Sequence, residues 1–227
     1  MQFSRTLTAA AVLALVDAAA LSSRTTGKAT FYGGNVSGGT CSFVGYTIPS
    51  GLYGVAMGEV NWDGAKTCGG CVEVTGPKGN RITAQVVDQC PECDAGHLDL
   101  FPDAFAELDD PSKGIIPITW NYVDCPITSA ITLRNKEGTS PYWFSMQVIN
   151  ANKRVNTLEF SSNGGSSWTG TERKYYNYFE YPAGSKTSTV DIKITSIDGD
   201  VLVVKNVGIG GGVTATASGN FGSGSTL

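Results

Sequence analysis

Residues 86–105 read VVDQCPECDAGHLDLFPDAF, and the fold is organised around this stretch. Leu98 and Leu100 flank Asp99, and alternate side chains of an extended backbone point to opposite faces. Both leucines would then enter the core, while Asp99 would point outward. Pro102 suits the first turn of a short helix that follows. The stretch therefore predicts a carboxylate presented on the open face of an anchored strand, with a solvated acid on an edge strand as the alternative.

Length and composition limit the class of protein. The chain has 227 residues and 29 glycines, enough for one large core or two small ones with many tight turns. Residues 1–20 have the features of a secretory signal peptide, with Arg5 before an apolar run and small residues at 18–20. The apolar run is too short to span a bilayer. We therefore expect a secreted, extracellular protein that has no membrane partner.

The six cysteines all lie between Cys41 and Cys125, and the rest of the chain has none. Two C-x-x-C motifs, at 68–71 and 90–93, have a spacing that fits a zinc ribbon. That interpretation leaves Cys41 and Cys125 unused and ignores the signal peptide. The oxidising environment of a secreted protein favours three disulfides and no metal site. The sequence alone does not fix the pairing of the cysteines.

The distribution of charge also divides the chain. From Arg24 to Ile127 six Lys and Arg accompany twelve Asp and Glu, whereas from Thr128 onward nine accompany seven. Neither half is basic enough to follow a phosphate backbone, so we expect no nucleic-acid partner.

Short segments with strand character, separated by turn residues, predict an all-β chain. The first half has one modest helix and these strand candidates: 28–32, 54–60, 71–74, 80–87 and 115–123. They predict a small β-barrel over residues 24–126. The second half has hairpin signals at 163–165 and 198–199 and these strand candidates: 131–133, 144–149, 154–160, 190–194 and 201–204. They predict an immunoglobulin-like β-sandwich over 130–210, and residues 211–227 are expected to be a flexible Gly/Ser tail.

Glycosidic hydrolysis usually needs two carboxylates, one acting as acid and one as base. Asp99 is the candidate acid, and Asp88, on the strand just before Cys90, would act on it by like-charge repulsion if the two share a site. Residues 18–58 contain no acid, so Thr30 and Tyr32 offer only hydroxyl groups to a sugar. An acid without a base is expected to bind a polysaccharide and to cleave it poorly.

Aromatic residues are frequent in the second half. Tyr142 and Trp143 follow Pro141, which would hold Tyr142 outside the regular strand and let both rings lie on one surface. Aromatic rings with polar edges suit the flat apolar faces of sugars, and Lys136 could add a polar contact. Packing within the sheet is the alternative for any single ring.

Taken in order, these motifs resemble those of microbial expansins over nearly all of the mature sequence. The motifs are KATFYGG at 28–34, CGGC at 68–71, VVDQCPEC at 86–93, HLDLFPDAF at 97–105, KEGTSPYWF at 136–144 and KYYNYF at 174–179. The resemblance implies a six-stranded double-ψ β-barrel, related to family 45 glycoside hydrolases, followed by an immunoglobulin-like carbohydrate-binding module. It implies binding to cellulose and loosening of plant cell walls without hydrolysis or a cofactor.

The resemblance also assigns roles to residues. Asp99 matches the essential acid of the family, Asp88 and Thr30 its supporting groove residues, and Tyr32 and His97 complete the expected groove. The implied binding platform comprises Tyr142, Trp143, Tyr176 and Lys136. The implied disulfides are Cys41–Cys68, Cys71–Cys125 and Cys90–Cys93. The sequon at Asn35 predicts a glycosylation site on an exposed loop. The expected partners of a monomeric protein are cellulose and matrix polysaccharides such as xyloglucan, xylan or pectin.

Two other functions remain open. A weak hydrolase or lytic transglycosylase would take its base from a loop, with Glu59 and Asp63 as candidates. A barwin-like defence or inhibitor module would bind protein or chitin. The chain also departs from the family, because Phe101 replaces the usual serine before the helix and so removes an N-cap. Tyr142 likewise replaces a tryptophan, which would weaken the platform.

Overall fold

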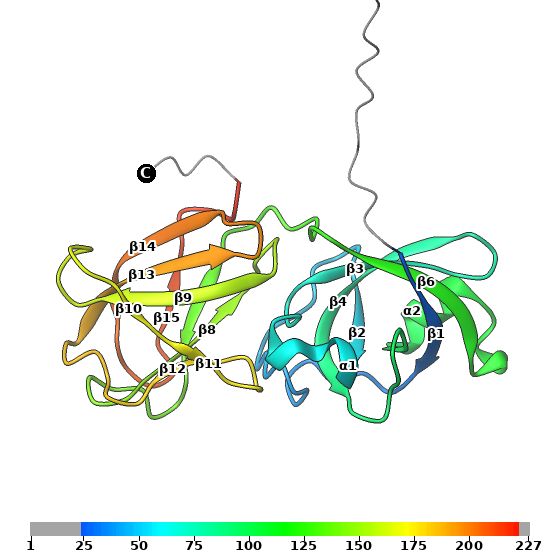
Figure 1. The fold of residues 1–227 in the computed structure, drawn as a ribbon, viewed down its shortest axis with the longest axis horizontal. Coiled ribbons are helices and arrows are strands. Elements are labelled where there is room, and N and C mark those ends of the chain that lie inside the picture. The colour runs from blue at the N-terminus through cyan, green and yellow to red at the C-terminus, as the bar shows by residue number, and fades with distance from the viewer. Residues whose placement is uncertain (1–23, 223–227) are drawn as a thin grey trace, which may run out of the picture.

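A computed structural model describes residues 24–222, and the predicted signal peptide lies outside this range. The chain forms two β-rich bodies side by side, joined by a short link after Cys125 (Figure 1). The first is a closed six-stranded barrel in the order β1-β5-β2-β4-β3-β6. The second consists of two sheets, in the orders β10-β9-β13-β14 and β11-β12-β8-β7-β15. The predicted all-β class, barrel and sandwich are confirmed.

Every strand of the barrel pairs on both sides. Its strands are β1 Thr25–Phe31, β2 Tyr53–Gly58, β3 Cys71–Thr75, β4 Arg81–Cys90, β5 Leu98–Leu100 and β6 Ile116–Val123. Its helices are α1 Glu59–Trp62, α2 Pro102–Leu108 and two 3-10 turns, η1 Asp63–Ala65 and η2 Pro111–Lys113. The alternation in β4 buries Ile82, Ala84 and Val86 against a core that also contains Trp62 and Trp120. The Trp120 indole N–H donates to the Gly96 carbonyl at 3.0 Å.

The segment at 98–102 has the predicted geometry. Leu98 and Leu100 are fully buried in the barrel core, and Asp99 between them is only partly buried. Pro102 occupies the first turn of α2, whose residue Phe105 is buried. Phe101 at the N-cap makes no side-chain capping bond, in agreement with the expectation from the missing serine.

Three disulfides cross-link the barrel: Cys41–Cys68, Cys71–Cys125 and Cys90–Cys93. These are the pairs that the resemblance implied, and they use all six cysteines. The zinc-ribbon alternative is therefore wrong for this structure, since no thiol is left to bind a metal.

The sandwich encloses a second core. The strands of its first sheet are β9 Val155–Ser161, β10 Thr169–Gly170, β13 Thr189–Ser196 and β14 Val201–Gly208. Those of the second are β7 Thr132–Asn135, β8 Phe144–Ile149, β11 Glu172–Arg173, β12 Phe179–Tyr181 and β15 Thr214–Thr216. Phe144 and Phe160, from opposite sheets, stack at 4.9 Å between ring centroids and join the two layers. The 198–199 turn connects β13 to β14 as an antiparallel hairpin, as predicted.

Residues 211–222 correct the prediction of a flexible tail. β15 pairs antiparallel with β7, and beyond it Ala217 and Phe221 pack into the sandwich core. Phe221 is only 3% exposed. The Gly/Ser/Thr composition gave no indication of a strand here, because a short edge strand needs few apolar side chains. Residues 223–227 lie outside the described range.

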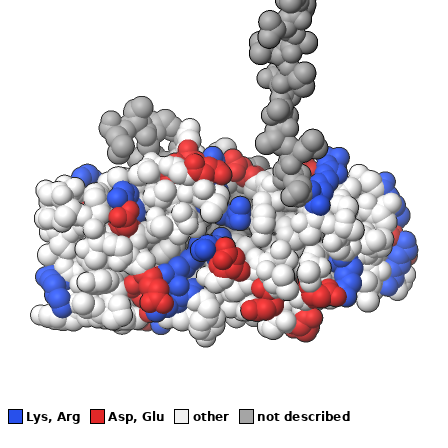
Figure 2. Space-filling model, in the orientation of Figure 1, with Lys and Arg blue, Asp and Glu red and all other residues white. Residues whose placement is uncertain are grey.

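The two bodies meet in a junction that combines polar contacts with packing of Ile149 from β8 against the barrel core. The Cys125 N–H donates to the Asn152 carbonyl at 2.7 Å, and the Arg154 guanidinium lies 4.0 Å from the centroid of the Tyr122 ring. Lys153 pairs with Asp124 of the link at 3.8 Å. On the face shown in Figure 2 the charged side chains form small groups, and Lys and Arg make no continuous track. Among residues 24–222 no helix is long and apolar enough to cross a bilayer.

Removal of the Phe221 ring tests the role of the C-terminal segment. We expect Phe221→Ala to lower the free energy of unfolding of the sandwich by about 3 kcal/mol, because the truncation leaves a cavity in the core. Urea denaturation measures the change. Val213→Ala is the control, since Val213 is 43% exposed and its truncation should cost at most about 0.5 kcal/mol. Equal stability of the two variants would show that the segment does not hold the sandwich together.

Candidate functional site

The strand register brings the predicted polar residues into one row on the outside of the barrel. Thr30 on β1 pairs with Asp99 on β5, Asp99 pairs with Ala56 on β2, and Ala56 pairs with Asp88 on β4. Ala29, which precedes Thr30, and both neighbours of Asp99 are buried in the core, so the Thr30 and Asp99 side chains share the outer face. We call this outer surface, with Thr30, Asp88, Asp99, Tyr32 and His97, the acid face.

Thr30 connects Asp99 to the only histidine. The Thr30 hydroxyl donates to Asp99 Oδ1 at 2.5 Å and lies 2.9 Å from His97 Nε2. A hydroxyl has one proton, so when Asp99 accepts it, the second contact requires His97 Nε2 to carry a proton and donate to Thr30. Burial, and then the nearby Lys28 ammonium, lower the pKa of His97 below its ordinary value. The neutral imidazole with its proton on Nε2 therefore orients Thr30 toward Asp99.

Asp88 is held more completely than Asp99. Its Oδ1 accepts from the backbone N–H groups of Thr40 at 2.7 Å and of Gln89 at 2.8 Å. Its Oδ2 accepts from the Tyr32 hydroxyl at 3.3 Å. Burial, and then the charge of Asp88, raise the pKa of Tyr32 well above its ordinary range, so the phenol keeps the proton that it donates. Three of the about four acceptor positions of this carboxylate are thus used by the protein.

Phe101 explains how the acid face tolerates the missing helix cap. Its ring meets Tyr32 edge-on at 5.6 Å between centroids and fills the space beside Gly34 and Gly54. A Cβ on Gly54 would come within 2.5 Å of the ring, so any other residue there would displace it. Packing of Phe101 therefore replaces the capping bond that a serine would make.

The Cys90–Cys93 disulfide supports the same face. Both cysteines are buried and form a small cluster with Ala56, against which Tyr32 packs. The carboxylates of Glu59 and Asp63, the alternative candidates for a base, lie on α1 and η1 outside the paired row and are exposed. Asp63 pairs with Lys66 at 3.3 Å.

The aromatic residues of the second domain gather where β8 begins and at the turn between β11 and β12. The Lys136 ammonium lies 5.6 Å from the centroid of Trp143 and 5.9 Å from that of Tyr176. Tyr142 precedes β8 in a turn closed by Ser140 and Trp143, and it is 76% exposed. This placement outside the strand is the one that the sequence predicted. Tyr142, Trp143, Tyr176 and Lys136 are called the aromatic platform below.

Hydrogen bonds fix the Tyr176 ring. Its hydroxyl donates to Glu180 Oε1 at 2.7 Å, and the Ser145 hydroxyl donates to the same oxygen at 3.1 Å. Burial, and then this bond, raise the pKa of Tyr176 to about 12. The ring therefore stays neutral and oriented at physiological pH.

Two residues beside the platform were not among those that the resemblance assigned to it. Tyr175 is 67% exposed and meets Tyr176 at 85° with centroids 5.0 Å apart, and the Lys186 ammonium lies 5.6 Å from the Tyr142 ring. The adjacent tyrosines at 175–176 were a signal for the first. The sequence around Lys186 gave no such signal, because Lys186 reaches Tyr142 only when a loop far along the chain folds back beside it.

The Asn35 side chain is exposed at the end of β1, and its Oδ1 accepts from the Gly38 N–H at 2.8 Å. Its glycosylation remains a prediction.

Comparisons with known proteins place this chain in a family. The family model described as lytic transglycolase, a double-ψ β-barrel model, matches residues 56–120. Expansin-YoaJ of Bacillus subtilis is 36% identical over 180 residues, which cover 78% of this chain and 75% of the relative. The chain belongs to the expansin family. The resemblance inferred from the motifs, and with it the double-ψ barrel, is confirmed.

Solved expansin structures share the whole architecture. The apo structure of Clavibacter michiganensis expansin is 33% identical, with a TM-score of 0.78, covering 88% of this chain and 98% of its own. A mutant of the same expansin, in complex with cellohexaose, has a TM-score of 0.79 at the same identity and coverage. The paired domains of this expansin therefore have a close structural counterpart.

The single histidine makes the electrostatics of the acid face measurable. We expect NMR titration of the His97 imidazole to give a pKa below the ordinary 6.5. Since the folded state disfavours the charged imidazole, stability should fall as the pH drops from 6.5 toward the folded pKa. Lys28→Met should raise this pKa, because it removes a neighbouring positive charge.

Lys66→Met is the control for that titration, since Lys66 pairs with Asp63 away from the imidazole. A His97 pKa at or above 6.5 in the unaltered protein would contradict the assignment of a neutral imidazole beside Thr30.

Proposed function

We propose that this expansin is a secreted protein that binds cellulose and other plant cell-wall polysaccharides and loosens their network without hydrolysing them. The observation that carries the proposal is the acid face itself. Asp99 accepts one side-chain hydrogen bond among the described residues, from Thr30, whereas Asp88 is engaged by three donors. Asp99 is therefore the carboxyl group that can exchange a proton or a hydrogen bond with a sugar.

In the part of the chain that the structure describes, no residue is evident that could act as the catalytic base opposite Asp99. Cleavage with inversion or retention requires a second carboxylate in a defined position across the glycosidic bond. Residues 24–58, which supply β1, β2 and the loop between them, contain no Asp or Glu. Asp88 already accepts hydrogen bonds from two backbone N–H groups and from Tyr32, so few of its acceptor positions remain for a water molecule.

The platform supports binding to a flat polysaccharide. Trp143 and Tyr142 present rings with exposed surface, and Lys136 and Lys186 lie within cation–π distance of them. The related Clavibacter protein was solved with cellohexaose, and we extend cellulose binding to this chain by that kinship. Xyloglucan, xylan and pectin are further candidate ligands for a protein that we expect to act as a monomer.

The match to a lytic transglycolase model supports a second candidate. Residues 56–120 include both Asp88 and Asp99, so the acid face falls within the matched region. A weak glycan-cleaving activity centred on Asp99 would also use this geometry. The two candidates differ in whether new sugar ends are formed.

Loss of one platform ring tests binding. We expect Trp143→Ala to weaken binding to cellulose by about tenfold, corresponding to about 1.4 kcal/mol of stacking energy. A pull-down isotherm on microcrystalline cellulose measures the change. Trp168→Ala is the matched control, because that indole lies beside Lys193 of the other sheet, 4.8 Å from its ammonium. Equal binding by the two variants would exclude the platform as the binding surface.

Loss of the acid tests the mode of action. We expect Asp99→Asn to abolish the weakening of cellulose paper under load while leaving cellulose binding within about twofold of wild type, because binding energy resides mainly in the platform. Reducing ends are measured in parallel on cellulose and on xyloglucan. Sustained release by the wild type that disappears in Asp99→Asn would replace our proposal with the glycan-cleaving candidate.

A further inference from the structure

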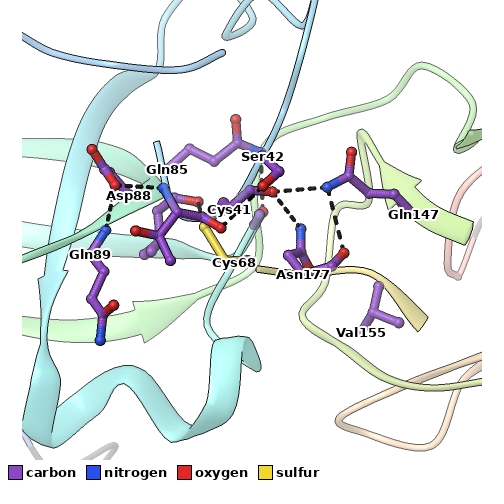
Figure 3. The surroundings of a disulfide bond; sticks show 12 residues. Cys41, Ser42, Cys68, Gln85, Asp88, Gln89, Gln147, Val155 and Asn177 are labelled. Atoms are coloured by element: carbon purple, nitrogen blue, oxygen red, sulfur yellow. Dashed lines mark hydrogen bonds between the residues drawn. A yellow bond between two sulfur atoms is a disulfide. The ribbon is translucent and has the colours of Figure 1, made fainter. Parts of the chain in front are cut away.

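The backbone carbonyl of Cys41 connects the barrel to the sandwich. The Thr40 N–H donates to Asp88 Oδ1 at 2.7 Å. The carbonyl of the next residue, Cys41, accepts from Gln147 Nε2 at 2.8 Å and from Asn177 Nδ2 at 3.3 Å. Figure 3 shows Asp88 on one side of Cys41 and the two amides on the other. Thr40 and Cys41 thus lie directly between the acid face and the second domain.

The barrel side of this connection is rigid. Cys41 is fully buried and cross-linked to Cys68. A Cβ on Gly39 would approach the Asn35 carbonyl oxygen to 2.3 Å and Asp88 Cγ to 2.9 Å, so the loop packs tightly against the acid face. A shift of the Cys41 carbonyl would therefore disturb the Thr40 contact with Asp88.

The sandwich side leads directly to the platform. Asn177 follows Tyr176 and closes the turn of residues 174–178, in which its N–H donates to the Lys174 carbonyl at 2.9 Å. Its backbone has a φ of 66°, and its Oδ1 accepts from Arg173 at 2.6 Å. The position of the Asn177 amide therefore sets the position of the Tyr176 ring.

Because the two amides are buried, loss of either hydrogen bond to Cys41 has a large energetic cost. Gln147 is fully buried and Asn177 is 2% exposed, so water does not replace a lost contact easily. A buried carbonyl that loses its donors has a larger energetic cost than an exposed one. The two amides therefore define a narrow range of orientations between the domains, beyond what the link at 125–130 imposes.

We propose that Gln147 and Asn177 are positioning residues that fix the aromatic platform relative to the acid face, so that one β-linked glucan chain contacts both. The inference rests on the proposed function. Two sites held in a fixed geometry bind a long chain more tightly than either site alone, because the second contact is intramolecular. A short oligosaccharide that occupies only the platform gains nothing from the fixed geometry.

The test compares a short and a long ligand by calorimetry, using cellotetraose and a soluble mixed-linkage β-glucan. Asn177→Asp keeps the acceptor for Arg173 and removes the donor to Cys41, and Gln147→Met removes the other donor with similar side-chain volume. We expect each variant to bind the polymer at least fivefold more weakly and cellotetraose within twofold of wild type. Asn156→Asp, on an exposed position of β9, is the matched control and should leave both affinities unchanged.

Small-angle scattering on the same proteins reports the domain arrangement without any ligand. The double variant should show a broader distribution of interdomain distances, while its thermal unfolding shows that both domains remain folded. If Asn177→Asp does not fold, Gln147→Met alone decides the question.

The inference would be overturned if folded variants bound the polymer and cellotetraose in the same affinity ratio as wild type. Equal losses for both ligands are one such result, and they would indicate a purely structural role. If the wild type bound neither ligand, the proposed function would fail, and this inference with it. Polymer binding by the wild type that the variants retain in full would overturn the inference alone.

Discussion

The alternation of side chains in the short strand β5 is the constraint on which the site depends. Leu98 and Leu100 fill the barrel core, so Asp99 is forced onto the outer face. Because β5 lies between β1 and β2 in a closed barrel, its register aligns Asp99 with Thr30 on one side and Ala56 on the other. A register shift of one residue would bury the acid and expose two leucines. The packing energy of the core thus fixes the position of the polar group.

The electrostatics of the acid face follow from burial together with the hydrogen-bond partners of each group. Asp88 is surrounded by donors and acts as a fixed anion that orients Tyr32 and the loop at 39–41. Asp99 has a single donor, whose own direction is set by a neutral histidine. The two carboxylates of this row therefore have different surroundings, with three donors on Asp88 and one on Asp99.

Much of this arrangement could be predicted from local patterns, and the rest depended on long-range contacts. The alternation around Asp99 and the proline at 102 predicted β5 and α2 correctly, because both signals are contained in a few residues. The disulfide pairs came only from the family resemblance, since spacing does not determine pairing. The strand at 214–216 was missed because its pairing with β7 is not encoded in its composition. Gln147 and Asn177 gave no signal, since their shared partner is a backbone carbonyl of the other domain.

The uneven distribution of cysteine has a consequence for how the molecule is made. Every cross-link lies within the barrel or at its exit, and residues 126–222 contain no sulfhydryl chemistry at all. Assembly of the first half therefore depends on an oxidant, whereas the second half can fold in any redox environment. In a host cytosol that keeps thiols reduced, these three cross-links would not form, whereas the sandwich has no cysteine that needs oxidation.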